Sequence, residues 1–228
     1  MIDELTLQVR EQQVSALWLS PPSPHACYVF AHGAGAGMAH SFMTAMSEGL
    51  LERGVATLRY QFPYMEKKSR RPDPPSLCHD TVRAACAEAV KLAPGVPLFA
   101  GGKSFGGRMT SQAQALQPLP GVRGLVFVGF PLHNAGKPDD SRAEHLSQVK
   151  VPMLFLQGDR DELASLQLLR PVVEKLDGLA TLRIFAHADH SFHVPAKSGK
   201  KDAQVMQEMV QGMGEWMEGV KVLAQDRA

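Results

Sequence analysis

The chain of 228 residues has the length of one α/β domain, and its 44% hydrophobic and 21% charged residues are typical of a globular protein rather than a disordered or fibrous one. Its 24 basic and 23 acidic residues give a formal net charge of +1, which argues against a nucleic-acid or membrane-surface protein. The length, with no segment that resembles a linker, predicts a single domain over residues 1–228. No apolar run is long enough to span a bilayer and no signal-peptide core is present, so we expect the protein in the cytoplasm.

The chain begins with a predicted antiparallel pair of strands at residues 6–10 and 14–19, joined through residues 11–13. A proline-rich break at residues 20–24 follows. Continuous apolar runs, which are typical of strands covered on both faces, then predict strands at residues 27–31, 55–60, 97–100, 125–128, 153–156 and 181–185. Cys27, Cys78 and Cys86 are too scattered for a disulfide framework or a zinc site, so we expect three free thiols in a reducing compartment, with no metal and no cofactor.

Helical segments separate most of these strands, at residues 40–53, 76–92, 108–116, 163–176 and 206–223. This alternation predicts an α/β fold with a mainly parallel, doubly wound sheet and helices on both faces. The last helix carries a stripe formed by Met206, Met209, Met213, Trp216, Val220 and Leu223. The stripe is either a binding surface or a face packed on the sheet, and packing is favoured.

The sharpest sign of chemistry is the pentapeptide Gly-Lys-Ser-Phe-Gly at residues 102–106, between a predicted strand and a predicted helix. A serine there occupies a tight turn with its hydroxyl exposed, and the flanking glycines avoid collisions across that turn. A phosphate-binding loop is one alternative, but its leading glycine would fall at Pro97, which has no N–H to donate. A glycine-rich turn without chemistry is the other. Ser104 is therefore the candidate nucleophile.

A second glycine-rich loop, His-Gly-Ala-Gly-Ala-Gly at residues 32–37, follows the first strand of the parallel run. An acyl carbonyl that becomes an oxyanion needs two N–H donors, and we expect them from Phe105 and Ala34. A dinucleotide-binding loop is the alternative, but Met38 stands where its third glycine is required. We interpret His32 as a hydrogen-bonding residue that shapes the loop rather than as a catalyst.

An activated serine also needs a base and a carboxylate that orients the base. Gly-Asp-Arg-Asp at residues 158–161 follows one late strand, and Ala-Asp-His-Ser-Phe at residues 188–192 follows the next. Parallel strands gather their functional groups at this edge of the sheet. The resulting chain order, serine then aspartate then histidine, is that of the α/β-hydrolases.

On these motifs, together with Tyr-Gln-Phe-Pro-Tyr-Met at residues 60–65 and Arg-Arg-Pro-Asp at residues 70–73, nearly the whole chain resembles the α/β-hydrolase superfamily. Within it, the chain is similar to the poorly characterised testis-expressed hydrolase-like branch, and more distantly to the dienelactone hydrolases. Those last enzymes carry cysteine where Ser104 stands, so their lactone substrate is not carried over.

The resemblance implies an α/β-hydrolase fold in which Asp161 is the catalytic acid and His190 the general base. It leaves Asp159 as a turn-forming residue. His187 and His193 flank the base as loop residues, and His193 stays open as an alternative to it.

The stretch at residues 129–151 is too short for the helical lid that lipases carry. We therefore expect an open site with a minimal lid or none, shielded at most by the loop at residues 61–75. That loop carries a basic cluster of Lys67, Lys68, Arg70 and Arg71. The cluster either attracts an acidic substrate or is solvated with its arginines paired to carboxylates, and the second interpretation is favoured.

The sequence thus predicts a serine hydrolase that cleaves an ester or related acyl bond of a small molecule through an acyl-enzyme. Ser104, Asp161 and His190 would be catalytic, and Ala34 and Phe105 would form the oxyanion hole. The partner is a small-molecule substrate, and neither nucleic acid nor a membrane is expected. A binding or scaffold protein that uses the same fold without catalysis is the alternative, because fold does not fix function.

Overall fold

The fold is described by a computed structural model that covers residues 2–225, with side chains for residues 2–220. Its centre is an eight-stranded sheet in the order β1-β2-β4-β3-β5-β6-β7-β8. The strands are β1 (Ile2–Val9), β2 (Gln12–Leu19), β3 (Ala26–Ala31), β4 (Val55–Tyr60), β5 (Leu98–Lys103), β6 (Val122–Val128), β7 (Met153–Gly158) and β8 (Ala180–Phe185). β2 pairs antiparallel with β1 and β4, and all other neighbours are parallel, as predicted.

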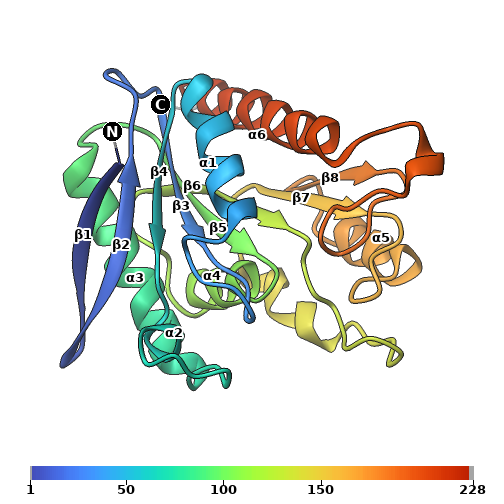
Figure 1. Ribbon diagram of the computed structural model, residues 1–228, viewed down its shortest axis with the longest axis horizontal. Helices are drawn as coiled ribbons and strands as arrows, with labels where there is room; N and C mark the ends of the chain where they lie inside the picture. Colours follow the sequence, from blue (N-terminus) through green and yellow to red (C-terminus); the bar gives the residue numbers. More distant parts are fainter. Residues whose placement is uncertain (1, 226–228) are drawn as a thin grey trace.

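Helices cover both faces of this sheet (Figure 1). One face carries α1 (Ser41–Glu52) and α6 (Asp202–Gln225), and the other carries α3 (Pro75–Leu92), α4 (Phe105–Leu116) and α5 (Leu166–Glu174). Shorter elements are α2 (Pro63–Glu66) and the two 3-10 turns η1 (Ser141–Gln148) and η2 (Ala196–Ser198). Among the described helices, none is both long and apolar enough to cross a membrane.

Two local expectations were wrong. The first two strands are joined by the turn Arg10-Glu11 rather than by residues 11–13, because Val9 pairs with Gln12 and Arg10 adopts a φ of 52°. The segment at residues 61–75 is not without regular structure, because α2 begins there at Pro63. A proline at the first helical position is favourable, but four residues are too few to show a helical period.

The core lies in two layers, one on each face of the sheet. The methionine stripe of α6 packs onto the sheet, as predicted: Met209 and Met213 are fully buried in a cluster with Val126 and Leu154. Met206 and Trp216 are partly buried against the same cluster, Val220 is buried, and the Leu223 side chain lies outside the described residues.

The three cysteines are free and buried, as predicted. Burial raises the pKa of Cys27, Cys78 and Cys86 to about 12 in each case. They are therefore protonated thiols near neutral pH and belong to the core rather than to any reactive site.

Candidate active site

The turn after β5 holds Ser104 in a conformation that side chains rarely adopt, with φ 50° and ψ −115°. A Cβ added at Gly102 would lie 2.6 Å from the carbonyl oxygen of Ala31, and one at Gly106 would lie 2.5 Å from that of His32. The end of β3 therefore packs so closely against the turn that only glycine fits on either side of the serine. Backbone strain of this kind is concentrated at functional sites.

The structure brings Ser104, His190 and Asp161 into one hydrogen-bonded chain. Ser104 Oγ lies 2.8 Å from His190 Nε2, and His190 Nδ1 lies 2.7 Å from Asp161 Oδ2. The side chain of Asp161 is 0% exposed, whereas that of His190 is 24% exposed. A buried carboxylate, a half-buried imidazole and a hydroxyl at the surface of the turn are thus arranged so that a proton can move from oxygen to nitrogen.

Two further groups hold the Asp161 carboxylate in place. Gln157 Nε2 donates to Oδ2 at 2.5 Å, and the Leu163 N–H donates to Oδ1 at 2.8 Å. Sequence reasoning missed Gln157, because a polar residue near the end of an apolar strand, here β7, carries no motif. Its amide also accepts the Phe130 N–H at 3.1 Å, so it ties the end of β7 to the loop after β6.

The two other candidates, Asp159 and His193, lie outside this hydrogen-bonded chain. Asp159 is exposed and accepts the His187 N–H at 2.7 Å, a contact typical of a turn-forming residue. His193 is exposed and its Nδ1 lies 2.8 Å from Asp202 Oδ2, which raises the pKa of that imidazole. The hydrogen bond to Ser104 therefore comes from His190 and not from His193.

The loop at residues 32–37 and the start of α4 present free N–H groups. Phe105 is the first residue of α4, where an N–H has no partner within the helix. In the described part of the chain, neither its N–H nor that of Ala34 donates a hydrogen bond. The Tyr64 hydroxyl donates to the Ala34 carbonyl at 2.9 Å and so fixes the loop, a contact that no local pattern reveals.

His32 shapes this loop from within, as the sequence suggested. It is fully buried, its Nδ1 lies 2.7 Å from the Gly33 carbonyl, and its Nε2 accepts the Phe62 N–H at 3.0 Å. Burial lowers the pKa of His32 from an ordinary 6.5 to about 4. The imidazole is therefore neutral in the folded protein and serves as a fixed donor and acceptor.

This neutral histidine makes stability depend on pH. The unfolded chain takes up a proton at His32 below about pH 6.5 while the folded chain stays neutral down to about pH 4, so stability is lost as the pH falls through that window. We expect the free energy of unfolding to fall by about 2 kcal/mol between pH 7 and 5 from His32 alone. Urea unfolding at both pH values checks this: the difference should shrink by that amount in His32→Gln, and an unchanged difference would contradict it.

Ser104 opens into a cavity of about 370 Å³. Its walls are the loop at residues 32–37, the start of α1 and the histidine loop, with lining residues Gly33, Ala34, Gly35, Ala36, His40, Phe42, Met43, Lys103, Ser104, His190 and Ser191. A second cavity of about 420 Å³ also has His190 in its wall and is lined by Arg160, Glu162, Leu163, His187, Asp189, His190, His193 and Pro195. Within the described residues, no cluster of histidine, cysteine and acidic side chains has the arrangement of a metal site.

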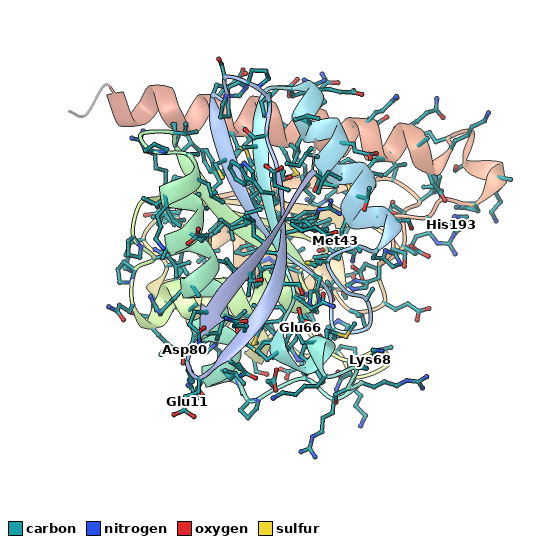
Figure 2. The ribbon with its side chains drawn as sticks, turned by 60° about the vertical axis from the view of Figure 1, so that its left-hand side comes forward. Glu11, Met43, Glu66, Lys68, Asp80 and His193 are labelled. Atoms are coloured by element: carbon teal, nitrogen blue, oxygen red, sulfur yellow. The ribbon has the colours of Figure 1, made fainter. Side chains whose placement is uncertain are left out.

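The basic cluster of the loop at residues 61–75 lies apart from this cavity. Its four side chains are exposed, and none of them lines the cavity around Ser104. Figure 2 shows Lys68 beside Glu66 and away from Met43, which does line it. The expected pairing of the arginines with carboxylates was wrong, because within residues 2–220 neither Arg70 nor Arg71 forms an ion pair.

Known proteins share this architecture. Residues 24–218 match the family described as "Alpha/beta hydrolase domain". The chain belongs to the α/β-hydrolase family. The resemblance seen in the motifs is thus confirmed at the level of the superfamily.

Solved α/β-hydrolase structures extend the agreement to the whole fold. A dienelactone hydrolase from Anabaena variabilis is 21% identical, with a TM-score of 0.79 over 96% of this chain and 97% of its own. A serine hydrolase without a lid from Xanthomonas campestris is 22% identical, with a TM-score of 0.73 over 94% of both chains. A serine hydrolase homologue from Coxiella burnetii is 21% identical, with a TM-score of 0.74 over 91% of this chain and 95% of its own. The predicted α/β-hydrolase fold is therefore confirmed, and the expectation of a minimal lid or none agrees with the described residues, in which no lid is evident.

Proposed function

We propose that this α/β-hydrolase is a serine hydrolase that cleaves an ester or related acyl bond of a small molecule. The observation that carries the proposal is the chain of hydrogen bonds from Ser104 through His190 to the buried Asp161, at 2.8 and 2.7 Å. A buried carboxylate behind the imidazole fixes its Nδ1–H and leaves Nε2 free to accept the serine proton.

In the proposed mechanism, Ser104 Oγ attacks the acyl carbonyl carbon while His190 Nε2 takes the hydroxyl proton. The carbonyl oxygen becomes an oxyanion and receives the N–H groups of Phe105 and Ala34, which donate to no other described group. His190 then gives its proton to the departing alkoxide, thiolate or amine, which leaves an acyl group on Ser104. Water then attacks the acyl carbon of this acyl-enzyme while His190 takes its proton, the bond to Ser104 Oγ breaks, and His190 returns the proton to Oγ as the acid product leaves.

The cavity beside Ser104 supports a small acyl group. Its volume of about 370 Å³ is near the lower end of ordinary ligand pockets, and Phe42 and Met43 give it an apolar wall. We also propose that the chain is similar to the testis-expressed hydrolase-like proteins, on the same set of motifs that carries the wider resemblance. That branch is poorly characterised, so it adds nothing to the substrate class; the catalytic geometry supports an acyl bond, and the cavity supports a small acyl group.

Covalent labelling distinguishes this enzyme from a scaffold that uses the same fold. A fluorophosphonate phosphonylates an activated serine, whose Oγ displaces fluoride from phosphorus once a base takes its proton, so we expect one label per folded chain, on Ser104. Intact-mass and peptide mass spectrometry check the stoichiometry and the site, and urea-unfolded protein is the control that should stay unlabelled. Absence of a label on the folded protein would favour the scaffold.

A further inference from the structure

Lys103 is the last residue of β5 and directly precedes Ser104. Its side chain turns toward the histidine loop, where Nζ donates to the main-chain carbonyl oxygen of His190 at 2.7 Å. The same Nζ lies 5.6 Å from the centre of the Phe192 ring and 6.0 Å from that of Phe42. Among the described side chains, no carboxylate forms an ion pair with it. A carbonyl and two aromatic faces therefore hold this cation.

We propose that Lys103 is a positioning residue whose ammonium group holds the His190 main chain and so keeps the imidazole between Ser104 and Asp161. This inference rests on the serine-hydrolase function proposed above. The base stands on a loop, whereas the nucleophile follows a central strand, and loops are the mobile parts of a fold. Lys103 ties the histidine loop to the strand that carries the serine.

The residues around the ammonium group leave space for it and compensate for its burial. Gly129, directly after β6, has a φ of 69°, and a Cβ there would lie 3.2 Å from Nζ and 3.4 Å from His190 Cε1. Burial of an ammonium group is unfavourable unless other interactions compensate, and a charge-assisted hydrogen bond together with two cation–π contacts supplies them. Methionine or leucine would fill the same space without the cost of burying a charge, so the ammonium group itself has a role.

Deprotonation of the Lys103 ammonium group should be visible in the pH dependence of the activity. Burial lowers the pKa of Lys103 to about 8, and the charges of Asp161 and Asp189 act against that shift. Within the described residues, the titratable groups that face Nζ are these two carboxylates and His190, all from the loops after β7 and β8. As the pH rises through 8, the neutral amine loses its cation–π contacts and makes a weaker hydrogen bond. The cysteines, with pKa values near 12, do not titrate there.

The experiment compares the wild type with Lys103→Met, which keeps the apolar stem and removes the ammonium group. Hydrolysis of p-nitrophenyl acetate is followed from pH 6.5 to 9.5, with circular dichroism to monitor folding. We expect kcat to fall about 30-fold at pH 7 with KM within about twofold, because the Lys103 side chain lines the cavity but its ammonium group is bonded to the His190 carbonyl and so acts through the base. The control is Lys150→Met, which removes an exposed ammonium group bonded to the Ser147 carbonyl at 2.9 Å and should leave activity unchanged.

The ratio of wild-type activity to Lys103→Met activity, measured across the pH range, tests the inference. We expect the advantage of the wild type over Lys103→Met to shrink above pH 8, because the wild type then loses the same charge. A folded Lys103→Met within about threefold of the wild type at pH 7, or a ratio that does not change with pH, would overturn the inference while the proposed function stands. Should Lys103→Met fail to fold, a wild-type kcat/KM that stays flat from pH 7 to 9.5 would overturn it. A wild type that neither hydrolyses esters nor takes the fluorophosphonate label would overturn the proposed function, and this inference with it.

Discussion

Replacement of Ser104 by alanine is expected to lower kcat/KM for p-nitrophenyl acetate by at least about 10⁴-fold. The change removes one oxygen atom, which lies 2.8 Å from His190 Nε2 and makes no cap bond to α4. The N–H groups of Ala34 and Phe105 stay in place, so any residual rate would come from water attack on a bound ester. Because no helix cap is lost, the free energy of unfolding should change by no more than about 1 kcal/mol.

The control for this variant is Ser147→Ala. Ser147 lies on η1, away from the cavity, and its exposed hydroxyl donates to the Glu144 carbonyl at 2.9 Å. Stopped-flow hydrolysis and urea unfolding of both variants separate loss of the nucleophile from loss of the fold. A Ser104→Ala protein that hydrolyses the ester at more than a tenth of the wild-type rate would rule out Ser104 as the nucleophile and would require another acyl acceptor.

The parts of the site that the sequence predicted are those that lie directly after strands. Ser104 follows β5, and Asp161 and His190 lie in the loops that follow β7 and β8, so an apolar run marks where each begins. Parallel strands place their carboxyl ends at one edge, which is why three motifs far apart in the chain meet. Strand β4 was predicted with its observed bounds, Val55–Tyr60, because both of its faces are buried.

The boundaries that were missed involve glycine and short elements. β5 continues through Gly101 and Gly102 to Lys103, although glycine gives no hydrophobic signal. α4 likewise begins at Phe105 rather than at Arg108, because Gly106 and Gly107 lie within its first turn. Gly102 and Gly106 are present because the end of β3 packs closely against them, whereas Gly101 packs against Val126 of β6. Close packing rather than helix or strand propensity selects these glycines, so propensity is misleading at the catalytic turn.

The supporting contacts were not predictable from local sequence. Three hydrogen bonds support the site, and each joins residues that only the complete fold brings together. They run from Gln157 to Asp161, from Tyr64 to the Ala34 carbonyl and from Lys103 to the His190 carbonyl. Lys103 shows the difficulty best, because it stands inside the most informative motif of the chain. The sequence places it before the nucleophile, and only the packing shows that its ammonium group reaches the base.

The second large effect is expected from Asp161→Asn, which should lower kcat about 10³-fold or more. The carboxylate accepts three hydrogen bonds, from Gln157, Leu163 and His190, and an amide has one oxygen to offer. One donor would then face an NH₂ group, which costs about 1–3 kcal/mol of stability and disturbs the imidazole. The imidazolium formed during acylation would also lose its counter-charge.

Asp159→Asn is the matched test of this assignment, because both aspartates belong to the same Gly-Asp-Arg-Asp motif. Asp159 is exposed and accepts one N–H, that of His187, and asparagine can keep this bond through its amide oxygen. Its kcat should therefore stay within about threefold of the wild type. Pre-steady-state acylation with p-nitrophenyl acetate measures both variants. If Asp159→Asn were the more damaging change, the acid would have to lie at the surface turn, and the buried carboxylate behind His190 would be structural.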